Sequence, residues 1–106
     1  MNDLAAKLRR ADFLFHPLDV EILGEQASSL GHHGRLVEKA MAALVAFDAA
    51  GGDEAGRRAL VRAAAKEVWA FFVQRELCGM RDHREVIRLY GIPPEVLVRL
   101  GAVERD

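Results

Sequence analysis

The stretch VEILGEQASSLGHHGRLVEKAMAALVAFDAA, residues 20–50, decides the fold, because its apolar residues recur at alternating steps of four and three. This spacing puts one apolar seam along a helix and is typical of a heptad repeat. The seam consists of Leu23, Ala27, Leu30, Gly34, Val37, Met41 and Leu44. Polar residues follow the opposite side at the same spacing, and Gly51-Gly52 ends the pattern. We therefore predict an amphipathic helix from Val20 to about Ala50, with Asp19 as its N-cap.

A second long helix is predicted over residues 54–77. Asp53 is a good N-cap for it, and Glu54 in the first turn suits the helix dipole. The middle of this helix is apolar almost all round, which is typical of a helix central to a core or buried in an interface. Its aromatic block of Trp69, Phe71 and Phe72 is interpreted as core packing, with the lining of a ligand pocket as the alternative.

Two short helices are predicted near the end of the chain. Asp82 gives a capping-box-like start to a helix over residues 82–90. Pro94 lies near the first turn of a helix over residues 94–101. The predicted fold class is therefore all-α: two long antiparallel helices plus two short C-terminal helices, packed as a small bundle.

The length and the composition of the chain limit the classes of protein to which it can belong. The chain has 106 residues, 51% of them hydrophobic and 29% charged, which fits one folded domain and argues against disorder. We assign residues 1–18 to an N-terminal arm and residues 19–106 to a single helical domain. The net charge of −1 gives no indication of a nucleic acid or a membrane surface as a partner. No apolar run is long enough to span a membrane. No signal peptide is recognised, so a cytoplasmic location is expected.

The length of the first helix bears on assembly. About thirty residues at ~1.5 Å each span roughly 45 Å, which is more than the diameter expected of a compact chain of this size. One face of the helix carries small residues at steps of three and four, namely Gly24, Ala27, Gly31 and Gly34. Each glycine inside a helix costs about 1 kcal/mol relative to alanine, and a closely approaching backbone would explain that cost. We predict a homodimer built on the two long helices, with a kink or break near Gly31–Gly34 as the alternative.

The densest polar cluster follows the second helix. Residues 74–84 read QRELCGMRDHR and contain the candidate site residues Arg75, Glu76, Cys78, Arg81, Asp82 and His83. Such a group could form an acid–base site or an anion-binding pocket at the start of the third helix. The plainer interpretation is structural: Asp82 caps the helix, Cys78 packs as a small apolar residue and the charged groups pair with neighbours. No residue is assigned as catalytic, because no motif supplies an orienting partner and an oxyanion site.

Two further patterns bear on metal binding and on DNA binding. His32 and His33 point about 100° apart on a helix, so they cannot chelate one ion as a pair, and no metal or cofactor is expected. Residues 85–100 match the register of a helix-turn-helix around Gly91, but the outward side of the second helix offers only one base and one acid. A helical hairpin that caps the bundle is preferred, and a DNA-associated regulator is kept as a third hypothesis.

Several segments of this chain also resemble a known family. They are Glu25–Gly31, Val68–Glu76, Cys78-Gly79, Arg81–His83, and the stretch from Ile92-Pro93 to Gly101-Ala102. Together they resemble a family of short uncharacterised helical proteins, mostly alphaproteobacterial, filed as a domain of unknown function, over about residues 18–103. The resemblance implies a bacterial cytoplasmic protein and carries over no activity or cofactor. The first hypothesis is a non-enzymatic module for self-association or for an unknown protein partner, and the second is a small-ligand or enzymatic site at the Arg75–His83 turn.

Overall fold

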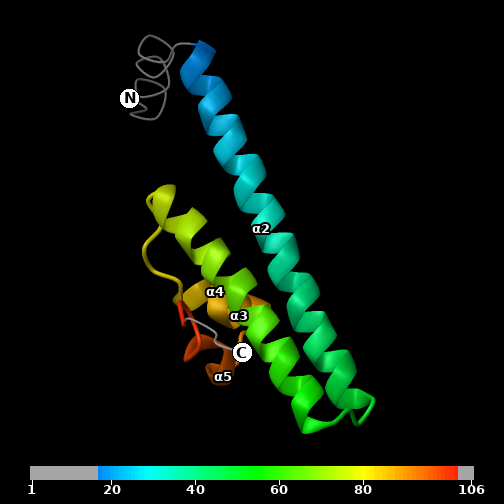
Figure 1. The fold of residues 1–106 in the computed structure, drawn as a ribbon. Coiled ribbons are helices and arrows are strands. Elements are labelled where there is room, and N and C mark those ends of the chain that lie inside the picture. The colour runs from blue at the N-terminus through cyan, green and yellow to red at the C-terminus, as the bar shows by residue number, and fades with distance from the viewer. Residues whose placement is uncertain (1–16, 103–106) are drawn as a thin grey trace, which may run out of the picture.

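The computed structural model describes residues 17–102, which form four helices and no strand. Two long helices, α2 (Pro17–Ala49) and α3 (Glu54–Leu77), lie antiparallel and side by side, and the short α4 (Arg84–Tyr90) and α5 (Pro94–Leu97) follow them (Figure 1). Helix α4 packs on α2, and α5 packs on α3. The predicted all-α fold of two long and two short helices is confirmed. Most of the predicted N-terminal arm lies outside the described residues.

Helix α2 begins at Pro17, three residues before the predicted start. A proline suits the first turn of a helix, because the N–H that it lacks would have no partner there. The prediction of Asp19 as the N-cap is therefore wrong, since Asp19 lies inside the helix. Helix α2 continues without a break through Gly31–Gly34, so the alternative of a break at this point is not observed (Figure 1).

The two long helices end in similar glycine turns. After α2, Gly51 adopts a φ of 70° and the N–H of Gly52 donates to the carbonyl of Phe47, which is a Schellman motif. Gly79 holds the equivalent position after α3, with a φ of 89°. Glycine takes this left-handed conformation at no steric cost. The next helix starts as predicted, because the Asp53 side chain accepts a hydrogen bond of 2.9 Å from a first-turn N–H of α3.

The core lies where α2, α3 and the C-terminal segment meet. Its largest fully buried side chains are Val37 from α2, Val68 from α3 and Val96 from α5. The seam of α2 is buried from Gly34 to Leu44, as its heptad spacing predicts, whereas its beginning, from Leu23 to Ala27, is exposed. The seam is therefore longer than the surface that the other described helices provide for it.

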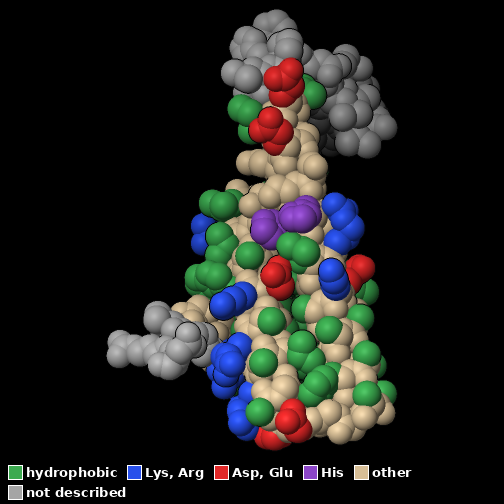
Figure 2. Space-filling view, turned by 45° about the vertical axis from the view of Figure 1, so that its right-hand side comes forward, with side chains coloured by type: hydrophobic (Ala, Val, Ile, Leu, Met, Phe, Trp, Pro, Cys, Tyr) green, Lys and Arg blue, Asp and Glu red, His purple; other side chains and the backbone are tan. Residues whose placement is uncertain are grey.

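Helix α2 extends well beyond the end of α3. Residues 17–29, which we call the overhang, cover about 20 Å at ~1.5 Å per residue and stand clear of the other helices (Figure 1 and Figure 2). The Cα atoms have a radius of gyration of 18.4 Å and extents of 59 × 30 × 19 Å. A compact chain of ~100 residues would have a radius of gyration of about 13 Å. An unbroken helix of this length therefore extends past the other described helices.

Candidate functional site

The predicted polar cluster forms a hydrogen-bonded network at the turn between α3 and α4. The ring of His83 stacks on Phe72 of α3, with centroids 4.1 Å apart and an interplanar angle of 8°. Arg75 Nε donates to His83 Nδ1 at 3.0 Å, and His83 Nε2 lies 2.9 Å from Glu76 Oε2. Because Nδ1 accepts a hydrogen bond, the ring proton is assigned to Nε2, which donates to Glu76. The His83 side chain is only 12% exposed, so this network fixes it between the two helices.

The start of α4 carries an ion pair of its own. The Asp82 carboxylate accepts hydrogen bonds from the backbone N–H of Arg84 at 3.1 Å and from the Arg84 guanidinium at 2.7 Å. The bond from the Arg84 guanidinium, and after it the backbone bond, hold the pKa of Asp82 well below its ordinary value. The predicted capping box and the predicted helix start at Asp82 are wrong, because α4 begins at Arg84 with His83 at the N-cap position. His83 makes no side-chain capping bond, since its ring is bonded to α3 instead.

Two of the predicted site residues stay outside this network. Cys78 is the half-buried C-cap of α3, and its sulfur lies 4.0 Å from Gln74 Nε2. The imidazole of His83 has both nitrogens bonded already, so it is not placed to act as a base for the thiol. Arg81 is exposed and makes no ion pair with any residue in the range 17–102.

The same turn offers little to an anion. Arg75 uses Nε for His83 and Nη2 for the backbone carbonyl of Asp82, which it reaches at 3.0 Å. The open hollow beside it, of about 500 Å³, is lined by Arg75, Asp82, Arg84, Glu85 and Arg88. Two carboxylates therefore lie among its guanidinium groups and offset their charge. These contacts hold the start of α4 against the end of α3.

Replacing His83 by alanine should lower the free energy of unfolding by roughly 1–3 kcal/mol, because Arg75 loses a buried partner and Phe72 loses its stacked ring. Urea unfolding followed by circular dichroism measures the loss. The matched control is His32→Ala, which removes an exposed histidine from α2 and should change stability by no more than about 0.5 kcal/mol. Equal effects of the two substitutions would contradict the role given to His83.

A second charged cluster, which the sequence did not predict, joins three helices. Arg57 near the start of α3 bonds to Asp48 at the end of α2 (Nε to Oδ1, 2.8 Å) and to Glu95 of α5 (Nη1 to Oε2, 2.6 Å). The bonds to Glu95 and Asp48 raise the pKa of Arg57, and the bond from Arg57 lowers the pKa of Glu95. Because that carboxyl pKa is lowered, the contact adds stability above the ordinary pKa of glutamate and loses it as the pH falls through the lowered value.

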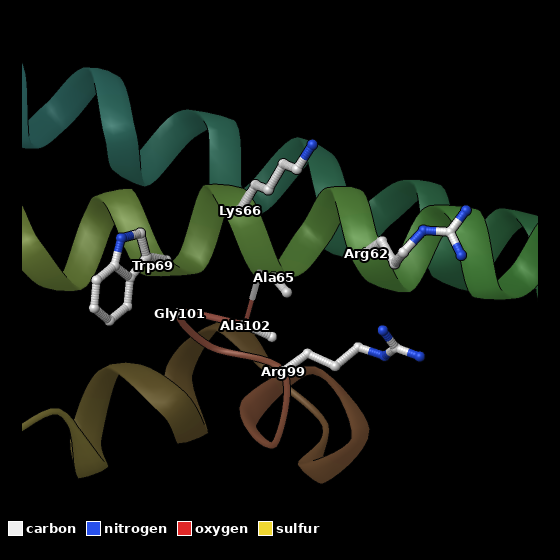
Figure 3. Close-up of a pocket in the computed structure, with 7 residues that line it drawn as sticks. All are labelled: Arg62, Ala65, Lys66, Trp69, Arg99, Gly101 and Ala102. Atoms are coloured by element: carbon white, nitrogen blue, oxygen red, sulfur yellow. The ribbon is translucent and has the colours of Figure 1, made fainter. Parts of the chain in front are cut away.

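A shallow hollow lies between α3 and the C-terminal turn (Figure 3). It measures about 170 Å³ and is lined by Arg62, Ala65, Lys66, Trp69, Arg99, Gly101 and Ala102. The indole of Trp69 is 50% exposed and lies over Gly101, where an added Cβ would be 3.2 Å from the ring. Figure 3 shows Lys66 extending away from Gly101 and Ala102, so the basic side chains do not converge on one point. Phe71 and Phe72 are core residues as predicted, but for Trp69 the core interpretation is wrong.

The metal and DNA-binding patterns find no support in the geometry. Helix α5 is a single turn of four residues, too short to lie along a DNA groove as a recognition helix. His32 is exposed, and the buried Nδ1 of His33 has no hydrogen-bond partner in the described part of the chain. Among residues 17–102 no group of three metal-ligating side chains gathers. None of the helices in this range combines the length and apolarity needed to cross a membrane.

The predicted helix-packing face splits into two parts. A Cβ on Gly34 would lie 3.0 Å from the Tyr90 hydroxyl, so a side chain of α4 occupies the space that this glycine leaves. A Cβ on Gly24 would meet nothing within 4 Å, and one on Gly31 would meet only the flexible guanidinium of Arg35, at 3.3 Å. Nothing packed in the described chain therefore requires glycine at positions 24 and 31, although each costs the helix about 1 kcal/mol relative to alanine.

Comparison with known proteins places the chain in one family. A family model described as "Family of unknown function (DUF6665)" matches residues 3–106. The match covers nearly the whole sequence, so the chain belongs to this family, and the predicted membership in a family of unknown function is confirmed. No curated protein and no solved structure matches the chain.

Proposed function

We propose that this member of a family of unknown function is a non-enzymatic self-association module, in which two copies pair through α2. The proposal rests on the exposed apolar side chains of the overhang. Its side chains Val20, Ile22 and Leu23 are 59%, 46% and 50% exposed, on a segment that the other described helices do not cover. An isolated stretch of helix is marginal in water, because most helical stability in proteins comes from tertiary packing. A second copy would supply that packing.

A chemical role for the α3–α4 turn has less support than self-association. The polar groups of Arg75, Glu76 and His83 are bonded to one another. A ligand would have to break these hydrogen bonds before forming its own, and each buried group left unpaired in that exchange costs free energy. The proposed function therefore assigns the turn to the stability of the fold.

Substitution of Leu23 by glutamate should weaken self-association at least about tenfold, because it places a charge in the apolar contact that the proposal requires. The packed part of the fold should persist, since Leu23 is exposed and lies outside the core. Sedimentation velocity over a dilution series measures association, and circular dichroism measures helix content.

The matched control for this experiment is Val98→Glu, which changes an 80% exposed valine at the end of α5. This variant should associate like the unaltered protein. If Leu23→Glu also associated like the unaltered protein, the overhang would not be the contact surface and the proposal would be wrong.

A further inference from the structure

We infer that the second copy docks antiparallel on one exposed face of α2 in a single register, so that each overhang lies along the groove between α2 and α4 of its partner. The inference rests on the proposed self-association and specifies its surface. The face, which we call the α2 stripe, consists of residues at steps of four and three: Gly24, Ser28, Gly31, Arg35, Glu38, Ala42, Val45 and Ala49. All of them are exposed except Gly31, which is partly exposed. The stripe runs beside the buried seam and takes no part in the packing on α3.

The α2 stripe is complementary to itself when it is reversed. In an antiparallel pair with heptad spacing, residues placed symmetrically about the centre of the contact face one another. With the centre between Leu36 and Val37, Arg35 faces the partner's Glu38. The remaining layers pair position 31 with 42, 28 with 45, and 24 with 49. Each of these three layers therefore pairs a glycine or serine from the first half of α2 with an alanine or valine from the second half of the partner's α2.

The two central charges are available for contacts between chains. Arg35 and Glu38 are both exposed, and neither makes an ion pair with any residue between 17 and 102. In a twofold symmetric pair the Arg35 contact with the partner's Glu38 forms twice. Charge pairs of this kind contribute mainly to specificity and register. A shifted or parallel alignment would lose both pairs.

The small residues of the stripe also acquire a role in this arrangement. A Cβ on Gly24 would meet nothing within 4 Å, and one on Gly31 would meet only the movable end of Arg35. In the described chain the space beside Gly24 is open, and only that flexible guanidinium lies beside Gly31. Small residues let two helix backbones approach closely, and the paired Gly31 and Ser28 positions lie on both sides of the central charges. The glycines that the single chain leaves unexplained are thus explained by the second copy.

A groove beside the stripe provides the rest of the surface. Two adjoining hollows of about 370 and 380 Å³ lie between α2 and α4, and both are lined by Met41 and Tyr90. Val45 and Leu89, which line them, are 70% and 74% exposed. In the inferred register the partner's Ser28 faces Val45. The partner's positions 32–35 face Glu38 and Met41, which line the hollow that holds Leu89, so both exposed apolar side chains are removed from water in the pair.

Charge reversal tests the central layer. Arg35→Glu alone and Glu38→Arg alone should each weaken association about tenfold to a hundredfold, because like charges then face each other twice. The double variant R35E/E38R restores opposite charges and should associate within about threefold of the unaltered protein. Lys39→Glu is the control, since Lys39 is an exposed charge on α2 outside the stripe. Sedimentation velocity gives the association constants, and circular dichroism verifies that each variant is folded.

Cysteine cross-linking tests the register directly, in a Cys78→Ser background. A chain carrying Gly31→Cys and Ala42→Cys together should form a covalent dimer on mild oxidation, because positions 31 and 42 face each other. Each single variant should stay uncoupled, since two copies of position 31 would lie about 16 Å apart along the helix, beyond the reach of a disulfide. A mixture of the two single variants should cross-link.

The outcomes separate the register from the proposed function. Rescue by the double charge variant, together with cross-linking only between positions 31 and 42, supports the inference. If the unaltered protein associates but the charge variants have no effect, or a single cysteine variant cross-links with itself, the register is overturned and self-association stands. If the unaltered protein is monomeric, for example because its own residues 1–16 cover the stripe, both proposals are overturned.

Discussion

Replacing Phe71 by alanine should lower the free energy of unfolding by about 3–5 kcal/mol, because a large buried ring is lost and a cavity remains. Phe71 is 4% exposed and meets Tyr90 edge-to-face, with ring centroids 5.6 Å apart. Its ring also lies 5.9 Å from the guanidinium carbon of Arg75. The substitution therefore removes a core side chain together with its contacts to Tyr90 and Arg75. Since a domain of this size is stable by only ~5–15 kcal/mol in total, the variant should be close to unfolding.

Urea unfolding followed by circular dichroism gives the size of this effect. The control is Leu89→Ala, because Leu89 is 74% exposed on α4 and its truncation should change stability by no more than about 0.5 kcal/mol in the monomer. Both variants should be compared at a dilution where association does not contribute. A loss of less than about 1 kcal/mol for Phe71→Ala would contradict the packing of α4 against the long helices.

Substitution of Val96 by aspartate should destabilise the protein by about 3–5 kcal/mol, because it leaves an unpaired charge in a buried site. Val96 is completely buried and belongs to the core formed with α2 and α3. Helix α5 is a single turn, so it has little packing to offset such a charge. The C-terminal segment should leave its place on α3.

Hydrogen exchange at the amides of residues 92–100 measures that release, and urea unfolding measures the total loss. Val98→Asp is the control, since it introduces the same charge two residues away at a side chain that is 80% exposed. Similar protection and stability in the two variants would show that α5 does not dock through Val96.

The long helices were predictable because their signals are local. Each signal lies in or directly beside the helix that it defines. The apolar steps of four and three run along α2, Asp53 precedes α3, and a glycine follows each long helix. The helix starts at Pro17 and Arg84 were missed for a related reason. Asp19 and Asp82 both match capping patterns, but Pro17 already suits a first turn, and Asp82 bonds to the residue that begins α4.

The contacts that assemble the site are not local, and the sequence could not supply them. The polar residues around the α3–α4 turn were found as candidates, but the stacking of His83 on Phe72 depends on how the chain returns to α3. Asp48 and Arg57 flank the predicted turn and could have been paired. Glu95, which is 38 residues from Arg57, carries no signal that points to it. The small-residue face was found as a pattern, yet only the structure separates Gly34, which packs on Tyr90, from Gly24 and Gly31.

The molar mass of the protein in solution tests the central claim most directly. Light scattering over a dilution series should give twice the mass of one chain at tens of micromolar, falling toward the mass of one chain on dilution. The same measurement on Leu23→Glu should give the mass of one chain at concentrations where the unaltered protein is dimeric. A mass of one chain for the unaltered protein at every concentration would contradict the claim that α2 is an association surface.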